Sequence, residues 1–147
     1  MKNSSVTVKW TGNLQFIGTD SNKHSIVMSS RDEANNTGVS PSQLLLIALG
    51  ACSAYDVVVI LQKKRLQLTG LDIVVNGEQE TDPPYTYRHI HVAYKLKGQG
   101  LTEKAVGQAV NLSLEKYCSV AATVSGQADI SCSFEILEDG GNNREAG

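Results

Sequence analysis

The sequence predicts an α+β fold in which strands, a long helix, two more strands, a second helix and a final strand follow one another. Three observations predict it. Several short segments alternate apolar and polar residues, as half-buried strands do. A long apolar run over 44–61 follows a helix-start signal, and the segment 101–117 repeats its apolar residues at helical spacing. Because strands and helices do not alternate one by one, the order argues against a parallel α/β sheet.

Three strands are expected before the long helix. The segment SSVTVKWTG alternates around Val6, Val8 and Trp10 and predicts a half-buried strand. The dipeptide Gly12-Asn13 follows it and predicts a hairpin into the next strand. KHSIVMSS predicts a third strand, and the polar segment after it, rich in Asn, Gly and Ser, predicts a loop.

The long helix has a clear predicted start and end. Ser40 is a preferred N-cap, and Pro41 suits the first helical position because its missing N–H would be unpaired there anyway. The helix is expected to run to about Arg65, where basic residues suit the negative end of its dipole. Asp56 interrupts the apolar run, and a charge at mid-membrane is costly. We therefore expect a helix of the core or of a subunit interface, with no membrane partner.

The second half predicts two strands, a helix and a closing strand. The two strands are LTGLDIVVNGEQE and YTYRHIHVAYKLKG, and the closing strand is ADISCSFEIL. The helix lies between the second of these strands and the closing strand. Its apolar stripe is expected to comprise Val106, Ala109, Val110, Ser113 and Tyr117. No repeat or linker interrupts the chain, so we expect a single domain over 1–147, with a frayed tail at about 138–147.

Composition and charge exclude several classes of function. The net charge is −2 and aromatic residues make up 5%, which argues against nucleic acid as a partner. The start of the chain lacks the apolar core of a secretory signal, so we expect a cytoplasmic protein. Three cysteines without a CxxC or a Cys/His cluster fit a reducing compartment and argue against a zinc site.

Two of the three cysteines have a simple packing interpretation. Cys132 shares one face of the last strand with Ile130 and Phe134, and free cysteine behaves as a small buried hydrophobe. Cys52 lies inside the apolar helix, where an inert packed thiol is one interpretation. Asp56 lies one turn later, and a nearby carboxylate disfavours a thiolate. A reactive Cys52 would therefore need a cation from elsewhere in the fold.

Cys118 allows two interpretations that periodicity does not separate. One continuous helix over 102–125 would place it mid-helix as an ordinary residue. A break at Tyr117-Cys118 would start a new helix at Ser119, and the positive end of that helix would lower the pKa of the thiol. His89 and His91 share a strand face without a third ligand, which favours a solvated face over a metal site.

Three segments resemble one known family. SPSQLLLIALGACSAYDVVVILQKKR is similar to the central-helix motif of the OsmC/Ohr family, the osmotically inducible and organic hydroperoxide resistance proteins. AVNLSLEKYCSVAATVSGQADISCSFEI resembles the second-cysteine segment and final strand of that family. The segment DPPYTYRHIHVAYKLKGQGLTEKAV fits the region between them. The sequences of the two cysteine segments are most similar to the YhfA-like branch of the family.

The resemblance implies a fold and a chemistry. It implies an OsmC-like α+β fold, with antiparallel sheets around a long central helix, in an intertwined homodimer with sites at the interface. It also implies a thiol peroxidase without a cofactor. Cys52 would attack an organic hydroperoxide and become a sulfenic acid, and Cys118 would resolve it through a disulfide. An external thiol or dithiol would then reduce the pair.

One position departs from the pattern of the family's peroxidases. These usually carry a glutamate after the proline of the helix start, paired with an arginine that activates the cysteine, and this chain has Ser42 there. Arg31, in the preceding polar loop, is the candidate for that arginine; its alternative is simple solvation. Two other functions stay open: a redox-active or small-ligand-binding dimer with little peroxidase turnover, and a dimeric scaffold whose cysteines only fill the core.

Overall fold

The computed structural model describes residues 1–138, and these form two compact units. The first unit is Met1–Leu45, and the second starts at Leu46 and takes in the rest of the described chain. The expected fraying of the tail falls on residues outside the described part, apart from Glu138, which ends a strand. The single domain expected for the chain stays a prediction.

The first unit contains a three-stranded antiparallel sheet. Its strands are β1 (Thr7–Gly12), β2 (Gln15–Thr19) and β3 (Ser25–Ser29), in the order β1-β2-β3. The hairpin predicted at Gly12-Asn13 is confirmed, and both residues have positive φ, 118° and 48°, which glycine and asparagine tolerate best. The sequence signal works here because turn geometry depends on the turn residues themselves.

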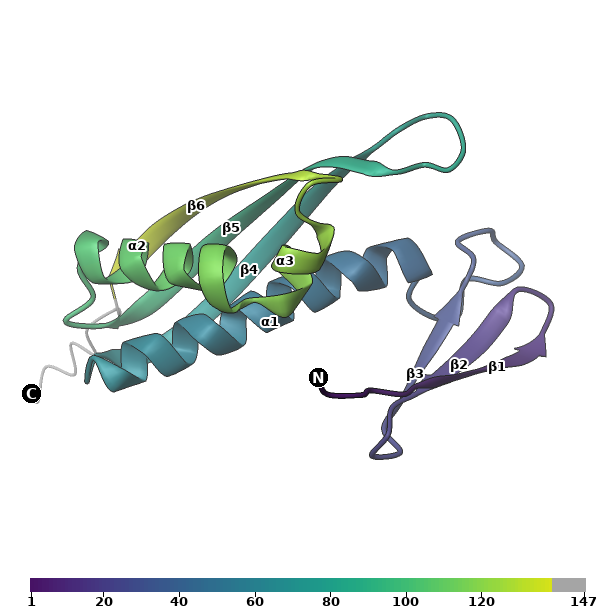
Figure 1. Cartoon of the computed structure of the whole chain (residues 1–147), viewed down its shortest axis with the longest axis horizontal. Helices are drawn as coiled ribbons and strands as arrows, with labels where there is room; N and C mark the ends of the chain where they lie inside the picture. The colour runs from purple at the N-terminus through teal and green to yellow at the C-terminus, as the bar shows by residue number, and fades with distance from the viewer. Residues whose placement is uncertain (139–147) are drawn as a thin grey trace, which may run out of the picture. The chain divides into compact units, whose positions relative to one another are not determined.

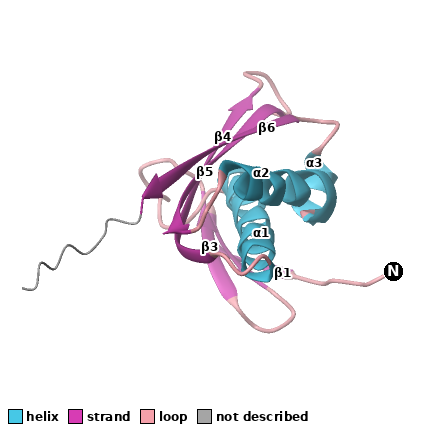
Figure 2. Cartoon of the chain, turned by 90° about the vertical axis from the view of Figure 1, so that its left-hand side faces the viewer, coloured by secondary structure: helices cyan, strands magenta, loops and turns pink. Residues whose placement is uncertain are grey.

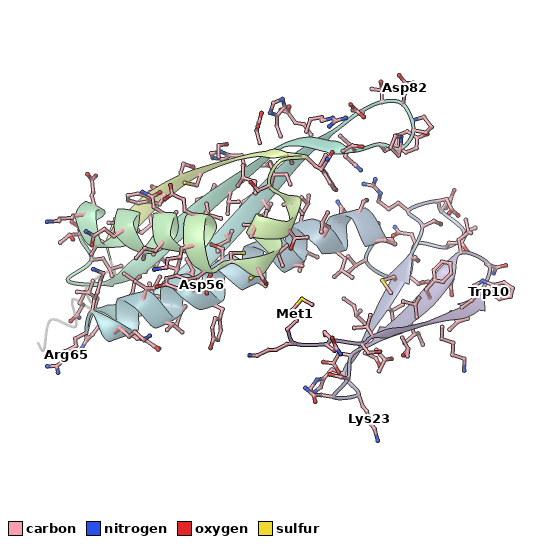
Figure 3. The ribbon with its side chains drawn as sticks, in the orientation of Figure 1. Met1, Trp10, Lys23, Asp56, Arg65 and Asp82 are labelled. Carbon is pink, nitrogen blue, oxygen red and sulfur yellow. The ribbon has the colours of Figure 1, made fainter. Side chains whose placement is uncertain are left out.

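The prediction that the first strand, β1, has a half-buried face is wrong for the described chain. Val8 is 63% exposed and Trp10 is 66% exposed, although their alternation is that of an apolar face. In Figure 3 the labelled Trp10 side chain lies on the sheet of this first unit. Alternation predicts which residues share a face, but that face becomes buried only where another layer covers it.

The second unit is built on a three-stranded mixed sheet. Its strands are β4 (Gln67–Gln79), β5 (Tyr87–Gln99) and β6 (Asp129–Glu138), with β5 in the middle. β4 and β5 pair antiparallel, as expected, but β6 runs parallel to β5. The segment between β5 and β6 is a helical crossover, which returns the chain to the end of the sheet where β5 began. The predicted α+β class is confirmed.

The long helix α1 (Pro41–Lys63) begins at the predicted residue. The Ser40 hydroxyl accepts a hydrogen bond from the Gln43 N–H at 3.4 Å, as an N-cap does. The helix ends two residues before the predicted Arg65, which has φ 58° and so leaves the helical conformation. By length and composition, α1 is the one described helix that could cross a membrane, a test that the core helix of a soluble protein also passes.

The core of the second unit lies between the sheet and its helices. In Figures 1 and 2, α1, α2 (Glu103–Leu112) and α3 (Ser119–Val124) cover the same face of the sheet. Alternate residues of β5 point into this core, because successive side chains of a strand point to opposite faces. The largest fully buried residues are Tyr94, Leu49, Leu61, Ile90, Leu96, Val57, Val92, Val106 and Val110.

Candidate active site around Cys52 and Cys118

The chain breaks between α2 and α3 at the position where two interpretations were open. Residues Ser113–Tyr117 form a π-helical turn, and the N–H of Cys118 donates to the Ser113 carbonyl at 2.7 Å. Cys118 itself has an extended backbone, with φ −72° and ψ 106°, and α3 begins at Ser119. The interpretation as one continuous helix over 102–125 is therefore wrong, and the alternative with a break at Tyr117-Cys118 is the one that the structure shows.

The π turn also changes which side chains face the core. Val106, Ala109, Val110 and Ser113 are buried, as the predicted stripe requires. Tyr117, the last member of that stripe, is 52% exposed, so its predicted burial is wrong. A π turn contains more residues than an α turn, so it rotates the residues that follow out of the expected register.

Cys118 is a buried residue that caps the short helix after it. Its side chain is 2% exposed, and its sulfur accepts a hydrogen bond from the Ala121 N–H at 3.3 Å. Burial raises the pKa of this thiol to about 11, and a hydrogen bond to Cys52 and the charge of Cys52 act in the same direction. The Ala121 and Val120 N–H groups at the start of α3 lower this pKa, as expected of a helix start, but burial outweighs them and the net pKa is raised.

Cys52 lies on α1, half-buried, against the first turn of α3. The Ser119 hydroxyl lies 3.9 Å from the Cys52 sulfur, and Ser119 directly follows Cys118. Burial raises the pKa of Cys52, but hydrogen bonds from the Val120 backbone, the Cys118 thiol and Ser119 together lower it more. The net pKa is below the ordinary value for a thiol. Cys52 therefore has hydrogen-bond donors where the sequence led us to expect only a cation.

Asp56, the carboxylate one turn after Cys52, is held by another residue. The Ser113 hydroxyl donates to its Oδ2 atom at 2.9 Å. In Figure 3, Asp56 lies where α1 passes the helical segment that follows β5. The carboxylate therefore accepts a hydrogen bond from the residue that starts the π turn.

Arg31 belongs to the first unit, whereas both cysteines belong to the second. It is exposed in the loop between β3 and α1, and Ser42 lies in the first turn of α1. The second unit brings Cys52 and Cys118 together by itself. A role for Arg31 in activating Cys52 stays a prediction.

The other candidate residues considered from the sequence are Cys132, His91 and His89. Cys132 is half-buried on β6 and packs against the core, and burial together with the Glu115 charge raises the pKa of its thiol. His91 lies between the Ser131 and Ser133 hydroxyls, 2.7 Å and 2.8 Å from its ring nitrogens, and His89 is exposed. Within residues 1–138 there is no group of three side chains that could hold a metal ion.

The sequence did not predict a network of three buried polar residues beside the cysteines. Hydrogen bonds join Ser53, which follows Cys52 on α1, to Tyr94 and to Ser113, and all three residues are buried. The only signal was Ser113 itself, a serine in the apolar stripe of its helix. Its partners lie 57 and 60 residues away along the chain, too far for local patterns to indicate them.

Comparison with known proteins connects this geometry to one family. Residues 34–133 match the family model described as OsmC-like protein. Protein YhfA of Escherichia coli K12 is 36% identical over 130 residues, which cover 88% of this chain and 96% of that protein. The crystal structure of a hypothetical protein from Aquifex aeolicus VF5 is 32% identical and has a TM-score of 0.85, covering 95% of this chain and 99% of that one.

A more distant structure carries a functional name. It is the organic hydroperoxide resistance protein OhrB of Bacillus subtilis, with 16% identity and a TM-score of 0.63. The match covers 91% of this chain and 98% of that protein. At this identity the likeness shows a shared fold.

Proposed function

The chain belongs to the OsmC-like protein family, and from this premise we propose that it is a cysteine-dependent peroxidase acting on organic hydroperoxides. Membership supports a peroxide-related or redox role in general. One observation carries the finer assignment: the Cys52 sulfur lies 3.9 Å from the hydroxyl of Ser119, the residue after Cys118, and the pKa of Cys52 is lowered while that of Cys118 is raised. A two-cysteine peroxidase needs one cysteine that attacks as a thiolate and a second cysteine that stays protonated until the first has been oxidised.

The proposed first step oxidises Cys52. Its thiolate attacks one oxygen of the hydroperoxide, the O–O bond breaks, and the sulfur keeps that oxygen as a sulfenic acid. The other oxygen leaves as an alkoxide and takes up a proton to become the alcohol. The two electrons come from the cysteine sulfur, so the step needs no cofactor.

The proposed second step uses Cys118 as the resolving residue. Its sulfur attacks the sulfenic sulfur of Cys52, a disulfide forms, and water leaves. Burial is the main cause of the raised pKa of Cys118, but the hydrogen bond to Cys52 and the Cys52 charge add to it. Oxidation of Cys52 to a neutral sulfenic acid removes that charge and so favours the Cys118 thiolate. An external thiol or dithiol then reduces the disulfide.

The working form in this proposal is a cytoplasmic homodimer. Its support is apolar surface that one chain leaves uncovered, including Ile47 and Tyr55 on α1 and Val8 and Trp10 on β1. Stable obligate interfaces bury on the order of 2,000 Å² or more, and such exposed apolar residues suit them. Sedimentation should give a dimer at micromolar concentration, and a folded monomer would contradict this part of the proposal.

A thiol count after one dose of oxidant tests the peroxidase assignment. The reduced protein receives one equivalent of cumene hydroperoxide or, in a parallel sample, of hydrogen peroxide. We expect the organic hydroperoxide to consume two thiols and the mass to fall by two hydrogens, faster than with hydrogen peroxide. If both thiols persist through the organic dose, the chain is a redox-inactive or ligand-binding member of its fold.

A further inference from the structure

A buried chain of hydroxyl groups runs through the second unit to the carboxylate of Asp56. Ser53 on α1, Tyr94 on β5 and Ser113 at the start of the π turn are fully buried. The Tyr94 hydroxyl lies 2.5 Å from the Ser53 hydroxyl, and the Ser113 hydroxyl lies 2.8 Å from that of Ser53. Ser113 then reaches Asp56 at 2.9 Å. Four side chains from three elements thus meet in one network.

The Asp56 carboxylate is one of two side-chain acceptors for the Ser113 proton in this network. An ionised carboxylate only accepts hydrogen bonds, and each hydroxyl has one proton to donate. The Ser113 hydroxyl is placed to donate its proton to Asp56 Oδ2 at 2.9 Å or to the Ser53 hydroxyl at 2.8 Å. The Ser53 and Tyr94 hydroxyls share a further hydrogen bond in which either oxygen can donate. Burial raises the pKa of Tyr94 to about 12, which keeps its proton available for this bond. Among the acceptors of Ser113, the Asp56 carboxylate is the group that can carry a charge, and a hydrogen bond to a charged acceptor is stronger than one to a neutral acceptor.

Ser113 also forms a hydrogen bond with the backbone of Cys118. Its backbone carbonyl accepts the Cys118 N–H at 2.7 Å, which closes the π turn. Its side chain bonds Asp56 and Ser53, which lie on either side of the turn of α1 that follows Cys52. One serine therefore ties the helix of the first cysteine to the backbone of the second. Single π turns are frequent at functional sites, because they displace the residues that follow.

We propose that Ser113 is a positioning residue that, held by Asp56, fixes the π turn so that Cys118 and the first turn of α3 rest against Cys52. The inference rests on the proposed function, since it explains how the two cysteines are kept in register for the resolving step. Without the side-chain bonds, the π turn is free to relax toward an ordinary α-helical turn. That change would rotate Cys118 away from Cys52.

Disulfide formation by diamide tests this inference without any peroxide chemistry. Diamide takes two electrons and two protons from a pair of neighbouring thiols and leaves a disulfide. We expect Ser113→Ala to slow formation of the Cys52–Cys118 disulfide between about tenfold and a hundredfold, the usual cost of misplacing reacting groups by about an ångström. Thr102→Ala is the matched control, because it removes the N-cap hydrogen bond at the other end of the same helical segment. It should lower the melting temperature and leave the rate unchanged.

A pair of variants at Asp56 keeps the test decisive if Ser113→Ala does not fold. Asp56→Asn keeps a side-chain oxygen to accept the Ser113 proton, so it should retain the wild-type rate of disulfide formation. Asp56→Ala removes the acceptor and should slow the reaction as Ser113→Ala does. Equal rates in the wild type, Asp56→Ala and Asp56→Asn, or equal losses in both variants, overturn the inference. A wild type that forms the disulfide with diamide but ignores organic hydroperoxide instead refutes the proposed function alone.

Discussion

Cys52 and Cys132 are both half-buried cysteines on regular elements of the same unit, yet their thiols differ in acidity. Burial raises the pKa of both, and the nearby Glu115 charge raises that of Cys132 further. Around Cys52 the hydrogen bonds from the first turn of α3 and from Cys118 outweigh burial, and the pKa falls. Burial alone therefore does not make a cysteine inert or reactive. The donors that a neighbouring segment brings to the sulfur decide the outcome.

The sharpest way to test this contrast is to remove each thiol in turn. Cys52→Ser should abolish consumption of organic hydroperoxide, because a hydroxyl does not replace a thiolate as nucleophile. Cys132→Ala should consume hydroperoxide at the wild-type rate, with only a modest loss of stability from the lost packing. Stopped-flow peroxide consumption compares the two directly. Comparable losses of turnover in both variants would refute a special role for Cys52.

The next largest effect separates Cys52 from its partner. Cys118→Ser should still react once with organic hydroperoxide, stop as a Cys52 sulfenic acid, and overoxidise when peroxide is in excess. Serine is a preferred N-cap, so this variant keeps a cap for α3 and is expected to fold. Mass spectrometry after one equivalent should find a single added oxygen on Cys52. A loss of two hydrogens in this variant would mean that another cysteine resolves the sulfenic acid.

The raised pKa of Cys118 should appear as an alkaline loss of stability. Its ordinary value is 9.0 and its folded value is about 11, so between these pH values the folded protein holds a proton that the unfolded chain has released. Stability is therefore full below about pH 9 and falls as the pH rises toward 11, by at most about 2–3 kcal/mol from this group. Urea unfolding at pH 8, 9 and 10 measures the slope. The Cys118→Ser variant should give a flatter profile, and an identical slope would contradict the assignment.

Local patterns predicted most of the fold, because the signals depend on neighbours in sequence. Gly12-Asn13 specified a hairpin, Ser40 and Pro41 specified the start of α1, and alternation specified the strands. The break before Cys118 was one of two alternatives, and the π turn that makes this break was not predicted. The side-chain partner of Ser113 at the start of that turn, Asp56, lies 57 residues earlier, beyond the reach of local patterns. The pairing of the cysteines entered through the family resemblance and not through periodicity.

The acidity of the thiols could not be predicted from the sequence either, because it depends on residues that are distant along the chain. The low pKa of Cys52 depends on donors from the first turn of α3, and Ser119 lies 67 residues along the chain. The exposure of Val8 and Trp10 marks another limit, since burial of a strand face depends on which layer covers it. Catalytic roles for Cys52, Cys118 and Arg31 remain predictions that only chemistry on the protein can test.

Arg31 should have the smallest effect of these, because the structure already supplies Cys52 with hydrogen-bond donors. A cation within about 4–6 Å of a thiolate can lower its pKa by one unit or more, and each unit changes the thiolate fraction about tenfold below the pKa. Arg31→Ala should then slow alkylation of Cys52 by iodoacetamide at pH 7 by up to about tenfold. Lys23→Ala, which removes another exposed cation of the same unit, is the control and should leave the rate unchanged. If both variants are alkylated at the wild-type rate, Arg31 is a solvated loop residue, and the hydrogen bonds from α3 and Cys118 suffice to explain the acidity of Cys52.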